Sequence, residues 1–277
     1  MSQVHASGNP SPAGAETKTG RFAGHVALVT GGGSGIGAAV ARQLAAEGCV
    51  AVHVADRDEL GARQVADRVG GHAHVVDVTD PVAVDAVVEA VLAEHGRIDV
   101  LVHTAGVDDP DAKSRILHAQ ESGEPVDVLC HLDDAAWRRV LSINLDGTFH
   151  VLRAAVRAMR PRGTGAIVTV GSSASFDTLT GYPHYAASKA GVHALSQAVA
   201  KEAIAFGIRV NTVAPGPVDT PMAGRTPAAV RTAMAESGVL GYASAEELAD
   251  NICYLASPGA SNVVGAVLLS NGGRFTV

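Results

Sequence analysis

The sequence has few cysteines, no basic run and no long apolar run, and each absence argues against a class of protein. Its three cysteines, Cys49, Cys130 and Cys253, lack paired spacing, so a disulfide framework or a cysteine zinc site is disfavoured and a reducing cytoplasm is favoured. With a formal net charge of -7, nucleic-acid binding has little electrostatic support. Because no apolar run reaches membrane-spanning length, we expect a soluble cytoplasmic protein without membrane contact.

The N-terminal residues differ in composition from the rest of the chain. Residues 1–20 are rich in Ser, Gly, Pro and Ala and contain no apolar segment of the signal-peptide kind, which predicts a flexible tail. We expect residues 21–277 to form one domain. Hydrophobic residues make up 47% of the sequence while aromatic residues make up 4%, and small and β-branched residues of this kind suit helices packed on a buried parallel sheet.

Strand-like and helix-like segments alternate along the chain. Strands are predicted at 25–30, 50–55, 72–78, 98–106, 165–172, 208–215 and 266–270. Helices are predicted at 35–48, 58–70, 81–96, 133–160, 185–206 and 244–257. This alternation predicts right-handed βαβ units and an α/β fold, a doubly wound parallel sheet of about seven strands with helices on both faces.

The segment 107–132 interrupts this alternation. It is long and polar and shows no clear periodicity, so we expect a long loop after the fourth strand. Ligands of such sheets bind beyond the carboxyl ends of the strands. The loop therefore either overhangs the site or is a disordered surface excursion.

A glycine-rich stretch lies between the first strand and the first helix. Glycines let the backbone approach a pyrophosphate, and the helix N-terminus presents N–H groups and a positive dipole end. This position is typical of dinucleotide binding, and a P-loop is rejected because no Lys-Ser/Thr follows the last glycine. The predicted cofactor contacts here are Gly31, Gly33, Ser34, Gly35, Ile36 and Gly37.

Acidic residues follow the second and third strands. Asp56 stands nineteen residues after Gly37, where an acid accepts hydrogen bonds from the adenosine ribose and repels a 2′-phosphate, which favours NAD over NADP. Arg57, the next residue, is able to pair with that phosphate, so NADP stays open. Asp77, with its neighbour Val78, is a candidate for the adenine edge, or else a residue of the following helix cap.

Two tyrosines precede one lysine in "DTLTGYPHYAASKAG", residues 177–191. Tyr185 and Lys189 stand four residues apart and share one face of a helix, whereas Pro183 biases Tyr182 away from the helix. A tyrosine hydroxyl has a pKa of about 10, which a fixed positive charge lowers. We therefore predict that Tyr185, rather than Tyr182, is an acid/base.

Several motifs occur together in a characteristic order: TGGGSGIG (30–37), HTAG (103–106), SINL (142–145), GSS (171–173), YAASK (185–189) and NTVAPGPVDTPM (211–222). With them the chain, from about Arg21 to its C-terminus, resembles the short-chain dehydrogenase/reductase family. The resemblance implies a single-domain Rossmann fold, a substrate-binding region at 221–243 and a homotetramer. By position it implies four catalytic residues: Asn144, Ser172, Tyr185 and Lys189.

The resemblance gives each of these residues a role. Tyr185 supplies or removes the proton of the reacting oxygen. Lys189 lowers the pKa of the tyrosine and holds the nicotinamide ribose. Ser172 hydrogen-bonds the reacting oxygen; Ser173 is its rival, but thirteen residues separate Ser172 from the tyrosine, as in the family. Asn144 binds a water in a proton relay.

The resemblance extends to the cofactor and the substrate. Besides Tyr185 and Lys189, it implies cofactor contacts at Thr104, Ala105, Gly106, Pro215, Gly216, Val218 and Thr220. The predicted function is an NAD-dependent oxidoreductase that transfers hydride between the cofactor and a secondary alcohol or ketone. The alternatives are an NADPH-dependent 3-oxoacyl thioester reductase and a non-catalytic dinucleotide-binding sensor, although a sensor has no chemical need for the four catalytic residues.

Four histidines are candidates for a structural, substrate-binding or metal-binding role. His103 replaces the asparagine usual in the family's motif, and we expect a structural effect on the central strand. His184 either contacts substrate or faces solvent in a loop. His72 and His74 share one strand face, but no acidic or cysteine partner shows metal-ligand spacing nearby, so no metal site is predicted.

Overall fold

The fold is known from a computed structural model, which describes residues 20–277 except 225, 227 and 237–239. The tail predicted for residues 1–20 lies, apart from Gly20, outside the described residues. The substrate-binding region predicted at 221–243 is described in part. No helix of the described residues combines the length and the apolar character needed to cross a membrane.

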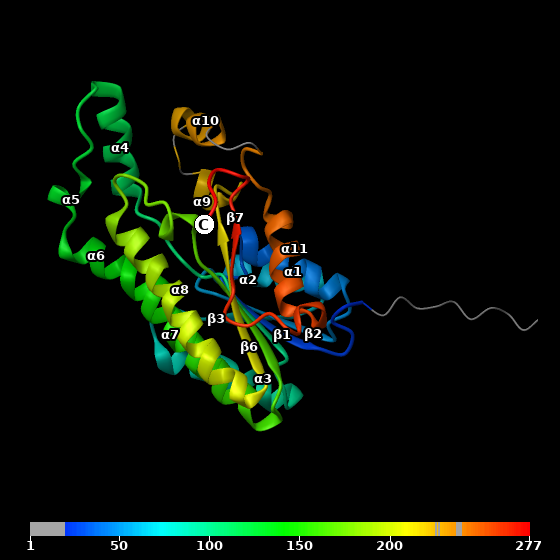
Figure 1. Ribbon diagram of the computed structural model, residues 1–277. Helices are drawn as coiled ribbons and strands as arrows, with labels where there is room; N and C mark the ends of the chain where they lie inside the picture. The colour runs from blue at the N-terminus through cyan, green and yellow to red at the C-terminus, as the bar shows by residue number, and fades with distance from the viewer. Residues whose placement is uncertain (1–19, 225, 227, 237–239) are drawn as a thin grey trace, which may run out of the picture.

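A sheet of seven parallel strands forms the centre of the domain (Figure 1). The strands are β1 (Val26–Thr30), β2 (Ala51–Asp56), β3 (His72–Val75), β4 (Val100–His103), β5 (Gly165–Val170), β6 (Ile208–Pro215) and β7 (Val267–Ser270). Their order is β3-β2-β1-β4-β5-β6-β7, so the direction of winding reverses between β1 and β4. The prediction of a doubly wound parallel sheet is confirmed, and a crevice is expected at this reversal.

Helices cover both faces of the sheet (Figure 1). One face packs on α1 (Gly35–Ala46), α2 (Glu59–Val69) and α11 (Ala245–Ala256). The other packs on α3 (Pro81–His95), α7 (Gly147–Met159) and α8 (Pro183–Ala203). In β1, Ala27 and Val29 join the first core while Val26 and Leu28 join the second, because successive strand residues face opposite sides. A parallel sheet buried on both faces therefore requires an unbroken apolar strand.

The helix predicted at 133–160 is interrupted near its middle by a π-helical turn. It consists of α6 (Asp134–Leu141), a π-helical turn (Ser142–Asp146) and α7. The described residues also form α9 (Pro221–Gly224), α10 (Ala228–Glu236) and 3₁₀ turns at Arg160–Arg162, Ser173–Ser175, Ile204–Phe206 and Pro258–Ala260. Single π turns within α-helices occur frequently at functional sites, and this one contains Asn144.

The prediction of a long loop at 107–132 is wrong. The segment forms two helices, α4 (Pro110–Ser122) and α5 (Val128–His131). The Asp109 side chain caps α4 by accepting a hydrogen bond from the backbone N–H of Asp111, at 3.1 Å, and Pro110 takes the first helical position. Gly123 ends the helix in the left-handed conformation, with φ of 72°. These start and stop signals were present in the sequence.

A small apolar stripe explains why α4 is helical although its composition is polar. Ala112, Ile116 and Ala119 recur at helical spacing and are buried. Ile116 and Ala112 form a separate cluster with Val128, against which Tyr182 packs. The helix therefore packs beside the start of α8, as Figure 1 shows, rather than forming an irregular excursion.

Candidate active site

A cavity of about 700 Å³ lies at the carboxyl ends of the strands, where the strand order reverses. The structure places nearly all of the residues predicted for the cofactor in its lining: Gly31, Ser34, Gly35, Ile36, Gly37, Asp56, Arg57, Asp77, Val78, Thr104, Ala105, Gly106, Tyr185, Lys189, Pro215, Gly216, Val218 and Thr220. Ser172 lines it too, whereas Gly33 and Asn144 are not among the lining residues.

Two glycines shape the phosphate end of the cavity. Gly31 has φ of 72°, and a Cβ there would collide with the backbone of Ala105. A Cβ at Gly37 would collide with the carbonyl oxygen of Gly31 and crowd the Thr104 hydroxyl. That hydroxyl donates to the carbonyl oxygens of Thr30 and Gly31, at 2.9 and 3.1 Å. Backbone packed this closely leaves the N-terminus of α1 open toward the cavity, which fits a pyrophosphate.

Asp56, the last residue of β2, is held in place by backbone donors. Its Oδ2 accepts a hydrogen bond from the N–H of Gly33 at 2.9 Å, and its Oδ1 accepts one from the N–H of Asp58 at 3.0 Å. Gly33 therefore orients this carboxylate through its backbone N–H. A carboxylate held at the end of the second strand is placed to receive ribose hydroxyls.

Asp77 lies at the same end of the cavity, after β3. Its Oδ1 accepts hydrogen bonds from the backbone N–H and the hydroxyl of Thr79, at 2.9 and 2.8 Å. These bonds lower the pKa of the Asp77 carboxyl below its ordinary value. The cap of α3 is Asp80 instead, whose side chain accepts from the N–H groups of Val82 and Ala83.

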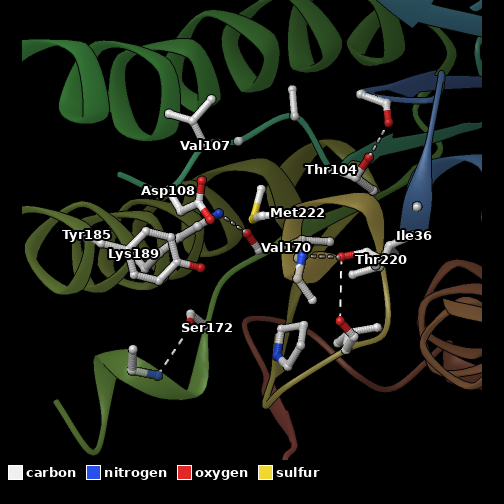
Figure 2. Close-up of a pocket in the computed structure, with 18 of the residues that line it drawn as sticks. Ile36, Thr104, Val107, Asp108, Val170, Ser172, Tyr185, Lys189, Thr220 and Met222 are labelled. Carbon is white, nitrogen blue, oxygen red and sulfur yellow. Dashed lines mark hydrogen bonds between the residues drawn. The ribbon is translucent and has the colours of Figure 1, made fainter. Parts of the chain in front are cut away.

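Helix α8 presents the predicted acid/base to the other end of the cavity. Pro183 occupies its first turn, and Tyr182 is the residue just before the helix, with φ of -126°, as the sequence predicted. Tyr185 and Lys189 lie one turn apart and both line the cavity (Figure 2). Tyr182 also lines it, and burial raises the pKa of Tyr182 to about 12.

Ser172, the residue just before a 3₁₀ turn after β5, lies on the same side of the cavity as Tyr185 (Figure 2). Burial raises the pKa of Tyr185 above its ordinary value, and the charge of Asp108 raises it further, while the hydrogen bond with Ser172 lowers it. Burial lowers the pKa of Lys189 to about 8, and its Nζ donates to the carbonyl oxygen of Val170 at 2.9 Å. The ammonium is therefore fixed near the tyrosine by backbone.

Asn144 is wholly buried in the π turn and supports this arrangement. Its Oδ1 accepts from the N–H of Val107 at 2.8 Å, and its Nδ2 donates to the carbonyl oxygen of Val107 and to the Ser188 hydroxyl, both at 3.0 Å. A Cβ at Gly106 would lie 3.2 Å from both Asn144 Oδ1 and Lys189 Nζ. The amide and the ammonium thus converge on the same glycine.

The sequence analysis missed several cavity residues. Asp108 and Lys113 form a largely buried ion pair at the start of α4, and the Lys113 ammonium also donates to the carbonyl oxygen of Met222, at 3.3 Å. This contact connects α4 with α9 across the cavity. Arg274 and Phe275 also line the cavity without a prediction, whereas Met222 and Tyr242 belong to the substrate-binding region predicted at 221–243. Recognising the helix signals in the supposed loop would have placed Lys113 near the site.

His184 has neither of the positions expected for it. It is fully buried, and its Nε2 lies 2.9 Å from Oδ2 of Asp109, the residue that caps α4. Arg139 of α6 lies 3.3 Å from the other carboxylate oxygen. His184 therefore fastens α4 to the first turn of α8. His103 in β4 is also buried and hydrogen-bonds Thr30 of β1 at 2.7 Å, consistent with the structural effect expected for it.

Replacing Asp109 by alanine is expected to lower the free energy of unfolding by about 3 kcal/mol, because it leaves the buried His184 without its partner. The measurement is urea unfolding followed by circular dichroism. Asp111→Ala, in the same helix but exposed, is the matched control and is expected to change stability by less than about 0.5 kcal/mol. Equal effects of the two variants would contradict this role of Asp109.

This fold and cavity are those of a dinucleotide-dependent oxidoreductase. The family model described as short chain dehydrogenase matches residues 25–231. Cis-4-hydroxycyclohexanecarboxylate dehydrogenase of Sinomonas cyclohexanicum is 44% identical over 92% of this chain and 98% of that protein. The 3-oxoacyl-(acyl-carrier-protein) reductase FabG of Escherichia coli (strain K12) is 34% identical over 92% of this chain and 99% of its own length.

Solved structures share the fold of this chain. A structure described as ribose-5-phosphate isomerase from Brucella melitensis 16M has a TM-score of 0.81, with 35% identity over 92% of this chain and 94% of that chain. That of gox2181 has a TM-score of 0.80, with 29% identity over 92% and 96%. The chain belongs to the short-chain dehydrogenase/reductase family and is an oxidoreductase of CH–OH groups.

Proposed function

We propose that this protein is an NAD-dependent dehydrogenase of secondary alcohols, or reductase of the corresponding ketones, with Tyr185 as its acid/base. The observation that carries the proposal is that the side chains of Tyr185, Ser172 and Lys189 lie together at one end of a cavity. The glycine-rich turn and the Asp56 carboxylate stand at the other end. The reacting groups and the cofactor-holding groups thus share a single space.

The lining residues fit a nicotinamide dinucleotide along the whole cavity. The N-terminus of α1 would hold the pyrophosphate, Asp56 the adenosine ribose, and Pro215 to Thr220 the nicotinamide end. When bound, such a cofactor supplies the hydride acceptor or donor that the twenty ordinary side chains lack. The choice of NAD over NADP rests on the negative charge of Asp56, which would repel a 2′-phosphate.

The protein's own part in the reaction is proton transfer and positioning. Tyr185 takes the hydroxyl proton of an alcohol in oxidation and returns it to the oxygen of a ketone in reduction. Ser172 hydrogen-bonds the same oxygen and holds it within reach of Tyr185. The positive charge of Lys189 favours the tyrosinate form. Asn144, beside Lys189, would hold a water that connects the ammonium with solvent.

We propose that the substrate is a ring alcohol that carries a carboxylate. The 44% identity to a dehydrogenase named for such a compound supports this class. A 3-oxoacyl thioester reductase that uses NADPH is the second candidate, supported by the 34% identity to FabG and by Arg57 beside Asp56.

We also propose that the enzyme acts as a homotetramer in the cytoplasm. Trp137 of α6 and Phe149 of α7 are 39% and 44% exposed, and apolar side chains on these helices suit packing against a second copy. The three cysteines are free thiols, which agrees with a reducing compartment. Sedimentation analysis of the purified chain would test the assembly.

The test of the function is steady-state oxidation of hydroxycyclohexanecarboxylates and simple cyclohexanols, with NAD and NADP in parallel. We expect turnover with NAD and a higher kcat/KM for the carboxylates than for the uncharged alcohols. Reduction of 3-oxoacyl thioesters with NADPH, exceeding these activities, would favour the second candidate. Normal NADH binding without turnover of any substrate would instead support a non-catalytic sensor.

A further inference from the structure

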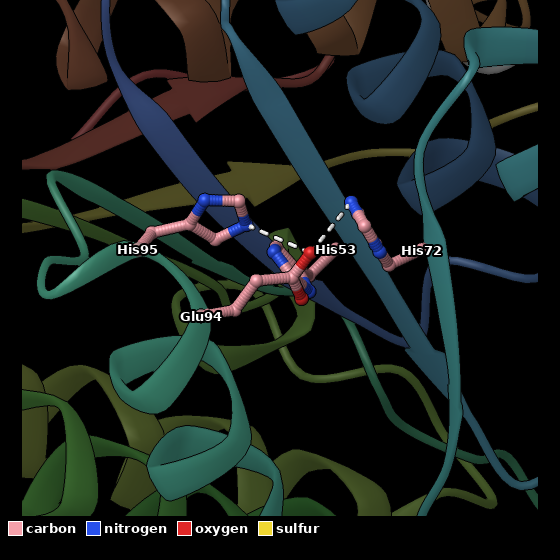
Figure 3. Close-up of side chains that lie close together, drawn as sticks. All are labelled: His53, His72, Glu94 and His95. Carbon is pink, nitrogen blue, oxygen red and sulfur yellow. Dashed lines mark ion pairs between the residues drawn. The ribbon is translucent and has the colours of Figure 1, made fainter.

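Four side chains that could hold a metal ion gather at the end of the sheet away from the cavity (Figure 3). His53 stands in β2 and His72 at the start of β3, where the two residues are partners in the parallel register. Glu94 and His95 end α3. One potential ligand atom from each lies within 4.8 Å of those of all the others. None of the four lines the cavity already described.

The cluster contains buried nitrogen atoms that the described part of the chain does not satisfy. His53 is fully buried, and its Nε2 has no hydrogen-bond partner among the described residues. His95 Nε2 also has no hydrogen-bond partner among the described residues. It lies 3.7 Å from a Glu94 oxygen, beyond hydrogen-bond distance. Burying such an atom without a partner costs free energy, so it requires an explanation. A bound cation provides one.

His74 orients the buried ring. It faces the same side of β3 as His72, but its Nε2 lies 2.9 Å from Nδ1 of His53. A hydrogen bond at Nδ1 leaves Nε2 of His53 as the ligand atom, and metal-binding histidines commonly have such a partner on their second nitrogen. His74 is therefore a positioning residue rather than a ligand.

We propose that His53, His72, Glu94 and His95 form a binding site for a divalent transition-metal ion of the Zn²⁺ class. Three imidazoles and one carboxylate are ligands that Zn²⁺ accepts in tetrahedral geometry. Bonds of about 2.1 Å place ligand atoms about 3.4 Å apart, so the site contracts on binding. The rings of His53 and His72, stacked at 4.5 Å, rotate so that their lone pairs converge. Glu94 is exposed and able to follow.

The site is structural rather than catalytic, because four protein ligands leave no open position for a substrate. It joins β2 and β3, at the edge of the sheet, to the last turn of α3. The opposite ends of these strands carry Asp56 and lead to Asp77 in the cofactor cavity. A bound metal therefore stabilises the edge that presents these carboxylates, without touching the reacting groups.

No metal site was predicted because no acidic or cysteine partner with metal-ligand spacing lies near His72 and His74 in the sequence. The partners of His72 come from β2 and from the end of α3, which are remote in sequence. Only the parallel pairing of β2 with β3 and the return of the chain after α3 bring them together.

The test is calorimetric titration with Zn²⁺ of the full chain, purified without a polyhistidine tag and treated with a chelator. We expect one equivalent to bind and the unfolding midpoint to rise with Zn²⁺ concentration. Glu94→Gln/His95→Gln is expected to weaken binding by about 10-fold or more, whereas His118→Gln, exposed in α4, leaves it unchanged. Absence of stoichiometric binding to the unaltered chain, or equal binding by the double variant, overturns the proposal.

Cobalt provides a second measurement that needs no variant. Co²⁺ bound at the proposed site is expected to show the intense visible absorption of tetrahedral coordination, and Zn²⁺ is expected to displace it. The weak absorption of octahedral coordination would instead indicate adventitious binding and contradict the proposal. Retained NADH binding by Glu94→Gln/His95→Gln would show that its fold is intact, since the four ligands lie outside the cofactor cavity.

Discussion

Replacing Tyr185 by phenylalanine is expected to lower kcat by about 10³-fold, because the variant loses the only proposed proton donor and acceptor at the reacting oxygen. The ring still fills its place on α8, and the glycine-rich turn is untouched, so NADH binding should change little. Steady-state kinetics and fluorescence titration with NADH measure the two effects. A large loss of kcat without a loss of cofactor binding identifies a group that acts in the transition state.

Tyr182→Phe is the matched control, because Tyr182 also lines the cavity and lies 6.5 Å from Tyr185, ring centre to ring centre. It should lose far less activity. If the two variants lost equal activity, or if Tyr185→Phe kept full turnover, the assignment would be wrong. Oxidation requires the deprotonated tyrosine, whose pKa burial raises, so kcat/KM for the alcohol should increase with pH through the alkaline range.

Replacing Asp56 by asparagine is expected to raise the ratio of kcat/KM with NADP to kcat/KM with NAD by about 10²-fold. The substitution removes the charge that opposes a 2′-phosphate and weakens acceptance of the ribose hydroxyls. It also leaves Arg57 beside the site without a competing carboxylate. The amide keeps one oxygen for the N–H of Gly33 but loses the acceptor for the N–H of Asp58.

Parallel kinetics with the two cofactors at a fixed alcohol concentration measure this ratio. Asp80→Asn is the control, because Asp80 also follows a strand and caps a helix but lies outside the cavity. It should leave the ratio unchanged. An unchanged ratio in Asp56→Asn would show that the carboxylate does not select the cofactor, and the NADPH-dependent alternative would then gain support.

The sequence by itself determined the class of fold and most of the cavity. The strands and helices are predicted from their own residues: β1 is a short run of mostly apolar residues, and α8 has Pro183 in its first turn. The spacing of Tyr185 and Lys189 likewise places both on one helix face without any tertiary contact. Because the strands are parallel, all their carboxyl ends lie at one edge of the sheet, and the residues that follow the strands come together there.

Only the tertiary structure decided which partners these residues have. The segment 107–132 was misread because its helix has a short apolar stripe, which becomes meaningful once Val128 and Tyr182 cover it. Gly33 was predicted to contact the cofactor, and only the folded structure shows that its N–H also donates a hydrogen bond to Asp56.

Two further groups of residues come together only through packing. They are the pair His184 and Asp109, and the cluster of His53, His72, Glu94 and His95. Backbone preferences and periodicity act over a few neighbouring residues, and the sequence displays them directly. Hydrogen bonds, ion pairs and ligand clusters depend instead on how elements that are remote in sequence pack together. No local sequence pattern contains that information.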